Sequence, residues 1–153
     1  MSRNIKFRLF DRQENKIIFE GFHVFGEVTL FNLIGIYALE TKGEKDSLER
    51  YSDFEIMEWT GLVDKNKKDI YESDVLEIET ANHTRVRMVC KWGTVQRTMD
   101  TGWEVDITGF HFYRTDGLAA FPITKNWAGK RDLDMLEVIG NLYETPELLS
   151  TTR

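Results

Sequence analysis

One stretch decides the fold of this chain: Trp59-Thr60-Gly61-Leu62-Val63-Asp64-Lys65-Asn66-Lys67-Lys68-Asp69-Ile70-Tyr71-Glu72-Ser73-Asp74-Val75. It is dense in turn-forming residues, and strand-like sequence flanks it on both sides. The apolar residues around Trp59 predict a strand that is kinked near its end, and Gly61 can adopt positive φ there without a steric clash. The residues from Asp64 onward predict a polar turn. Because lysine rather than glycine follows Asn66, we expect Asn66 itself to adopt the left-handed conformation.

A second tight turn is predicted at Glu72-Ser73-Asp74, before an alternating, half-buried strand over 75–79. Two turns that bracket a hairpin-like excursion explain the whole stretch most simply. The alternative is a binding loop on a rigid β scaffold, since loops often carry function. The carboxylates of Glu72 and Asp74 could share one side of the turn, but turn and capping roles explain them better than acid–base catalysis.

Composition bounds the class of protein. The chain has 153 residues, 41% of them hydrophobic, which predicts one domain over 1–153 with a proper core. The single cysteine, Cys90, excludes an internal disulfide and favours a reducing cytoplasm. The first residues lack the apolar stretch that is typical of a signal peptide, and no apolar run approaches the roughly 18 residues of a membrane span. The net charge of −6 argues against non-specific binding to nucleic acid.

Alternating residues predict strands along much of the remaining chain. Ile5–Leu9 predicts an amphipathic strand, and Ile17–Phe19 predicts its return across a hairpin turn. Two short strands are expected between 21 and 39, and a surface loop or one to two helical turns over 41–52. Further along, we expect a strand over 85–92 that ends at Gly93, strands over 103–107 and 110–113, and a small apolar element over 117–122.

The carboxy-terminal part predicts a final strand over 136–143, bent at Gly140, and then a short helix. Thr145 is expected as the N-cap of this helix. Pro146 suits the first helical position, and Glu147 complements the positive end of the helix dipole.

Three blocks of this sequence, residues 4–19, 54–78 and 136–149, resemble the YopX family of phage and prophage proteins. The middle and last blocks contribute these residues to the resemblance: Trp59, Gly61, Asp64, Asn66, Tyr71, Asp74, Gly140, Asn141, Tyr143 and Pro146. Lys67 and Ser73 depart from the family, which favours glycine at both positions. Each departure costs about 1 kcal/mol if φ must be positive. Residues 20–50 and 93–131 match nothing in the family and are treated as variable segments.

The resemblance implies a mainly β fold, α+β at most, with an SH3-like barrel element, hairpins and a short C-terminal helix. It also implies a protein encoded by a phage or prophage and located in the cytoplasm of a bacterial host cell. The family brings no established catalytic residues, so none is transferred to this chain.

No metal or cofactor site is predicted. The histidines His23, His83 and His111 lie in different expected elements, and a zinc site formed from two of them with Cys90 has no supporting spacing. Cys90 alternates with Val86 and Met88, so we expect these three side chains to face the core together.

One strand offers a candidate nucleic-acid interface. Basic residues alternate along it with a tryptophan nearby, and small barrels can use such basic and aromatic faces to bind single strands. The candidate residues are Arg85, Arg87, Lys91, Trp92 and Arg97. An ordinary solvated strand face is the simpler explanation.

We therefore expect a non-enzymatic phage accessory protein that acts through protein–protein interaction or self-association. Four tryptophans and ten phenylalanines are a large aromatic content for a small β domain, and Trp127 in a polar loop is a candidate exposed contact. The partner would be a host or phage protein, or a second copy in a homo-oligomer. Nucleic-acid binding is the second hypothesis, and a hydrolytic enzyme is the third.

Overall fold

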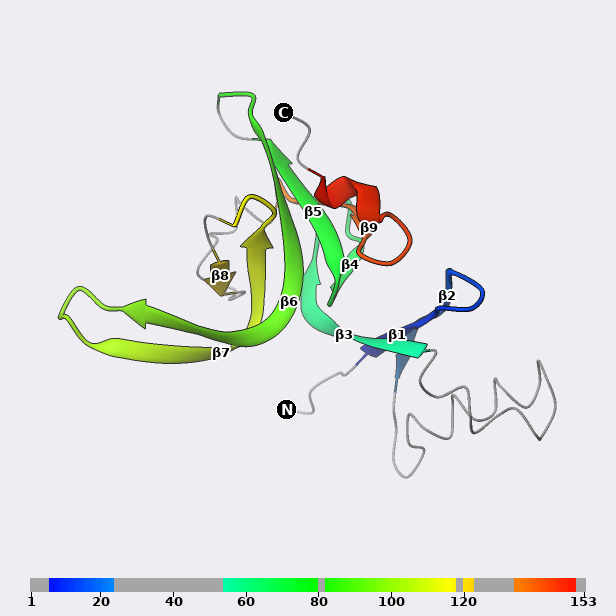
Figure 1. The fold of residues 1–153 in the computed structure, drawn as a ribbon, viewed down its shortest axis with the longest axis horizontal. Helices are drawn as coiled ribbons and strands as arrows, with labels where there is room; N and C mark the ends of the chain where they lie inside the picture. Colours follow the sequence, from blue (N-terminus) through cyan, green and yellow to red (C-terminus); the bar gives the residue numbers. More distant parts are fainter. Residues whose placement is uncertain (1–5, 24–53, 80–81, 118–119, 123–133, 151–153) are drawn as a thin grey trace. The chain divides into compact units, whose positions relative to one another are not determined.

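The computed structural model describes residues 6–23, 54–79, 82–117, 120–122 and 134–150 (Figure 1). The mainly β class predicted from the family is confirmed, with a four-stranded and a five-stranded sheet. The chain divides into two compact units, Met1–Trp59 and Thr60–Arg153. The expected loop over 41–52 and Trp127 fall outside the described residues, as do all but the first residues of the segment between 21 and 39.

The four-stranded sheet has the order β2-β1-β3-β4. Its strands are β1 (Lys6–Asp11), β2 (Lys16–His23), β3 (Phe54–Val63) and β4 (Asp69–Tyr71). The predicted opening hairpin is confirmed, and the Asp11 Oδ1 atom closes its turn by accepting backbone N–H groups of Gln13 and Glu14 at 2.9 and 3.1 Å.

The first strand is less regular than its alternation predicts, because Arg8 is 3% exposed. The ladder between β1 and β2 shifts register on both sides of the Arg8–Leu9 pair, which breaks the simple alternation of inward and outward side chains. On its other side, β1 pairs with β3, and the Arg8 Nη2 atom lies 3.3 Å from Met57 Sδ. A strand flanked on both sides can bury a residue that would be exposed on an edge strand.

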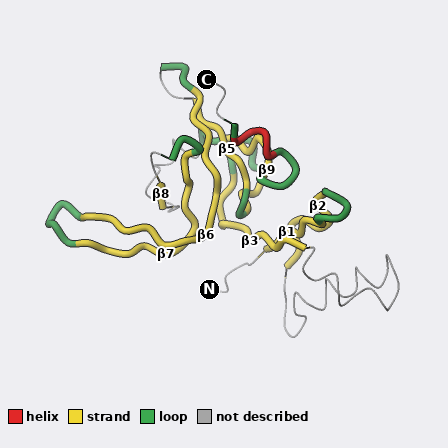
Figure 2. Tube along the Cα trace, in the orientation of Figure 1, coloured by secondary structure: helices red, strands yellow, loops and turns green. Residues whose placement is uncertain are grey.

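The five-stranded sheet has the order β8-β7-β6-β5-β9. Its strands are β5 (Asp74–Glu79), β6 (Arg85–Thr98), β7 (Glu104–Arg114), β8 (Ala120–Pro122) and β9 (Glu137–Asn141). The prediction that a strand ends at Gly93 was wrong, since β6 continues through it (Figure 2). Likewise, the two strands expected over 103–113 are one. Gly93 stands opposite Gly109 in an unbroken ladder, so both strands pass through a glycine without ending.

The core of the second unit lies on the inner face of this sheet. Met88 and Cys90 are buried in it and Val86 packs against it, which confirms the predicted inward side of β6. Ile78 also packs against this cluster, and its other buried members are Leu62, Ile70, Leu76, Phe110, Phe112, Leu136 and Val138.

The C-terminal helix is the single turn η2 (Pro146–Leu149), and it is a 3-10 helix. Thr145 occupies the N-cap position as expected, but its side chain makes no cap hydrogen bond. Its Oγ1 atom instead donates to the Asn141 carbonyl at 2.9 Å, which directs the hydroxyl back toward β9. Among the residues described, no helix is long and apolar enough to cross a membrane.

Candidate functional site

Asp64, one of the residues that match the family, is a buried hydrogen-bond acceptor. Its side chain is 2% exposed. The Oδ1 atom accepts the N–H groups of Asn66 and Lys68 at 2.7 and 2.9 Å, and the Oδ2 atom accepts the N–H of Val138 at 3.0 Å. One carboxylate therefore closes the turn between β3 and β4 and joins it to β9.

The polar turn differs from its prediction at one residue. Lys67 adopts the left-handed conformation with φ of 67°, where Asn66 was expected to do so. The Lys67 N–H donates to the Asp64 carbonyl at 3.0 Å and the Asp64 N–H to the Lys68 carbonyl at 2.9 Å. In a three-residue hairpin loop of this kind, the residue that follows the turn takes the left-handed conformation, and here that residue is Lys67. Gly61 has the expected positive φ, 85°.

Asp74 organises the second turn in a similar way. It is fully buried, and its Oδ2 atom accepts the Tyr71 N–H at 2.8 Å. Ser73 adopts a φ of 67°, the conformation that glycine would take freely. The Glu72 Oε1 atom lies 3.4 Å from the Trp92 N–H and thus reaches across to β6.

Asn141 is the third buried polar residue of this kind. Its Oδ1 atom accepts the N–H groups of Tyr143 and Glu144 at 2.9 and 2.8 Å, and its Nδ2 atom donates to Glu144 Oε2. Gly140 beside it has no room for a side chain, since an added Cβ would meet Thr145 Oγ1 at 2.1 Å. The family residues in this block thus fix backbone geometry.

Trp59 and Pro146, the remaining residues that match the family, lie near the surface. Trp59 is half-buried, with the Lys6 Nζ atom 4.3 Å from its ring centroid. Pro146 is exposed at the start of η2.

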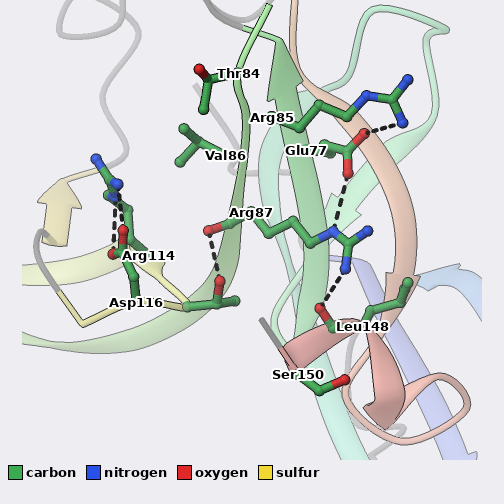
Figure 3. A pocket seen from close by; sticks show the side chains of 10 residues that line it. Glu77, Thr84, Arg85, Val86, Arg87, Arg114, Asp116, Leu148 and Ser150 are labelled. Atoms are coloured by element: carbon green, nitrogen blue, oxygen red, sulfur yellow. Dashed lines mark hydrogen bonds and ion pairs between the residues drawn. The ribbon is translucent and has the colours of Figure 1, made fainter. Parts of the chain in front are cut away.

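Two of the five candidate nucleic-acid residues are engaged with a carboxylate (Figure 3). Arg87 donates to Glu77 Oε2 at 3.1 Å and to the Leu148 carbonyl at 3.1 Å, so it joins β6 to η2. Arg85 lies 3.6 Å from Glu77 Oε1. Both guanidinium groups therefore share the Glu77 carboxylate.

The same arginines line a shallow pocket of about 360 Å³. Its other charged side chains are Arg114 and Asp116, which form an ion pair with each other. Each carboxylate in the pocket is therefore paired with at least one arginine. The three arginines and two carboxylates leave the pocket with one net positive charge.

The hypothetical zinc ligands lie apart. Cys90 is buried on the inner face of β6, whereas His111 pairs with Lys91 and belongs to the opposite face. His83 is exposed and binds Glu79 Oε1 at 2.7 Å. In the parts of the chain that the structure describes, no group of three or more His, Cys, Asp or Glu side chains could hold a metal ion.

The most distinctive surface is the outer half of the β6–β7 hairpin, which we call the arm and define as residues 93–109. It is drawn at the left of Figure 1 as two long strands that extend beyond β5 and β8. The ladder is regular from Met88, opposite Arg114, to Thr98, opposite Glu104. A turn closes the tip, where the Met99 N–H donates to the Trp103 carbonyl at 2.7 Å.

The register divides the arm into two chemically different faces, because directly opposed residues share a face. The apolar face comprises Val95, Arg97, Met99, Trp103, Val105 and Ile107. The polar face comprises Thr94, Gln96, Thr98, Glu104, Asp106 and Thr108. On the polar face, the hydroxyls of Thr94 and Thr108 lie 2.8 Å apart.

The apolar face of the arm is open to solvent toward its tip, whereas Val95, Arg97 and Ile107 are half-buried. Trp103 is 75% exposed, Met99 53% and Val105 37%. Sequence reasoning missed this face because it ended the first strand at Gly93. The signal was present in the alternation of Val95, Arg97 and Met99 before the turn at the tip.

The remaining candidates of the basic strand lie on both faces of the sheet. Lys91 and Trp92 are exposed at the base of the arm, and Trp92 packs edge-to-face on Phe110 with 4.9 Å between ring centroids. Arg97 is half-buried on the apolar face. Lys91 and Arg97 therefore face away from Trp92, and the structure does not gather the five candidates on one surface.

The comparisons with known proteins agree with this fold. A model of the YopX protein family matches residues 6–150. No curated protein matches the chain. Among solved structures, the chain is similar to the crystal structure of protein EF1440 from Enterococcus faecalis, with 19% sequence identity, a TM-score of 0.57, and coverage of 97% of this chain and 100% of that one. Because the family model covers nearly the whole chain, the protein belongs to the YopX family.

Proposed function

We propose that this protein is a non-enzymatic phage or prophage accessory protein that acts in the host cytoplasm by binding another protein through the arm. The observation that carries the proposal is the exposed apolar face, with Trp103 and Met99 at its tip. Tryptophan is among the residues that contribute most to protein–protein binding.

Physical reasoning supports a partner for the arm. A two-stranded hairpin is at best marginally stable by itself in water. Independent stability requires three or more strands with an apolar face, or packing against another element. The arm extends past the strands that pair with its base, and it keeps Met99, Trp103 and Val105 exposed to solvent. Burial of such a face against a partner would recover about 25 cal/mol for each Å² of apolar surface removed from water.

Charge supports a protein partner over nucleic acid, the second candidate. The arm carries Asp100, Glu104 and Asp106 but only one basic residue, Arg97. Phosphate backbones are bound by clustered basic residues, and three carboxylates would oppose that binding. The observation that best supports nucleic-acid binding is exposed Trp92, since aromatic rings can stack on bases.

Affinity capture from host lysate tests the proposal, with and without nuclease, followed by mass spectrometry and with light scattering to detect self-association. The test variant is Trp103→Ser, and Thr98→Ala on the polar face is its matched control. We expect specific partners that persist after nuclease with wild type and with Thr98→Ala, and that are lost with Trp103→Ser. Partners that vanish with nuclease, or that Trp103→Ser retains in full, would contradict it.

A further inference from the structure

Among the residues that the structure describes, none pairs with the outer edge of β7 in the arm. In the described residues, β7 pairs with β8 only at His111–Tyr113, and from Glu104 to Phe110 it pairs with β6 alone. An unpaired strand edge presents backbone N–H and C=O groups to any extended chain that approaches it. What can bind at this edge depends on which of these groups point outward and on which side chains surround them.

The alternation of hydrogen-bonded and non-hydrogen-bonded pairs along the β6–β7 ladder identifies the backbone groups that point outward. At one end, the Thr115 N–H donates to the Arg87 carbonyl at 3.1 Å, and at the other the Met99 N–H donates to the Trp103 carbonyl. Hydrogen-bonded and non-hydrogen-bonded pairs alternate in an antiparallel ladder, and the register between these two ends is unbroken. Thr94 and Thr108 therefore form a non-hydrogen-bonded pair.

It follows that Glu104, Asp106 and Thr108 direct their backbone N–H and C=O groups away from β6, toward the open edge. Their side chains are exposed on the polar face, and no ion pair joins either carboxylate to another described residue. Between them, Val105 and Ile107 place apolar side chains on the other face. A strand added to this edge would meet carboxylates on one side and apolar side chains on the other.

We propose that the β7 edge of the arm binds an extended segment of another protein in which basic and apolar residues alternate. The segment would continue the sheet as a third strand of the arm. Its basic side chains would lie beside Glu104 and Asp106, and its apolar side chains beside Val105 and Ile107. This inference deepens the proposed function and rests on it, because it names the chemistry of the partner and the edge that receives it.

Charge disfavours a second copy of this chain at the same edge. If two β7 edges paired around a two-fold axis at Ile107, Asp106 of each copy would lie diagonal to Asp106 of the other on the polar face. Diagonal neighbours lie about 7–8 Å apart, so the two like charges would repel each other across the pair. The β6 edge differs, because its side chains in the arm include Arg97 and no carboxylate.

The test uses the full-length chain and synthetic peptides of about nine residues, long enough for one strand. One peptide alternates valine with lysine, a second valine with glutamate, and a third valine with serine. Fluorescence anisotropy gives the affinities. Amide hydrogen exchange measured by NMR reports whether Glu104, Asp106 and Thr108 become protected on binding. We expect the lysine peptide to bind at least about tenfold tighter than the glutamate peptide, since charged groups are placed opposite each other.

A matched pair of variants isolates the edge. Thr108→Pro and Thr94→Pro each remove one outward N–H and the same hydroxyl contact, but on opposite edges of the arm. We expect Thr108→Pro to weaken binding about tenfold and Thr94→Pro by less than about twofold, because only the first blocks the receiving edge. The double variant Glu104→Lys/Asp106→Lys requires no proline and should reverse the preference toward the glutamate peptide.

The outcomes separate this inference from the proposed function. Equal effects of the two proline variants, or an unchanged preference in the double variant, would overturn edge binding, as would dimers that Thr108→Pro abolishes. If Trp103→Ser still eliminates partner capture in those cases, the proposed function stands without it. If Trp103→Ser also retained its captured partners, both edge binding and the proposed function would be overturned.

Discussion

The junction around Asp64 and the arm are built on opposite principles. At the junction, buried polar side chains hold the backbone: Asp64, Asp74 and Asn141 are each at most 5% exposed. In the arm, apolar side chains stand in solvent. The family model covers both regions, but none of the residues quoted for the family resemblance lies in the arm. The contrast separates residues that fix backbone geometry from the surface to which we assign the proposed interaction.

The largest effect on stability is expected for Asp64→Ala. It would leave three backbone N–H groups without their acceptor in a buried site, and each such loss costs about 1–3 kcal/mol. We expect destabilisation of about 4 kcal/mol, measured as a lower midpoint of urea unfolding followed by fluorescence. Asp100→Ala at the exposed tip of the arm is the control and should change stability by less than about 0.5 kcal/mol. Similar effects of the two variants would remove the contrast between the regions.

Gly140→Ala should have the next largest effect on stability. The added methyl group would overlap Thr145 Oγ1 and Leu148 Cδ1, and the Thr145 hydroxyl cannot move without breaking its bonds to Asn141. We expect a loss of about 2–3 kcal/mol by thermal unfolding.

Gly109→Ala in the arm is the matched control, since an added Cβ there meets nothing within 4 Å. It should leave stability within about 0.5 kcal/mol of wild type. If Gly140→Ala were equally harmless, the close packing of η2 on β9 would not matter to the fold.

Lys67→Gly should stabilise the protein. A non-glycine residue at φ of 67° is strained, and glycine adopts that conformation freely. Glycine also increases the conformational entropy of the unfolded chain, which offsets part of this stabilisation. The free energy of unfolding, measured in urea, should therefore rise by about 0.5–1 kcal/mol. Lys68→Gly, in the same turn but without positive φ, should destabilise instead. A destabilised Lys67→Gly would show that the lysine side chain contributes more than the backbone strain costs.

Much of the junction could be predicted from sequence because its information is local. Gly61 and the turn residues act within a few positions of themselves, so the kink and both turns were expected. The bond from Val138 to Asp64 spans most of the second unit, and no local pattern indicates it. The arm was divided at Gly93 because a lone glycine usually weakens a strand, whereas its pairing with Gly109 depends on a partner strand.

The smallest effect on stability is expected at Glu137, a half-buried residue beside the junction. A hydrogen bond from the Lys65 ammonium holds its pKa below the ordinary value. Because the pKa is depressed on folding, the associated stabilisation is present above the ordinary glutamate range and is lost as pH falls through the folded-state pKa. Lys65→Met should raise the pKa of Glu137 toward its ordinary value in an NMR titration of the carboxyl group. It should lower stability slightly at neutral pH but not at pH values where Glu137 is protonated, and added salt should reduce the difference. Lys68→Met should leave the titration unchanged, and an equal shift there would mean that general surface charge, not the Lys65 contact, sets the pKa.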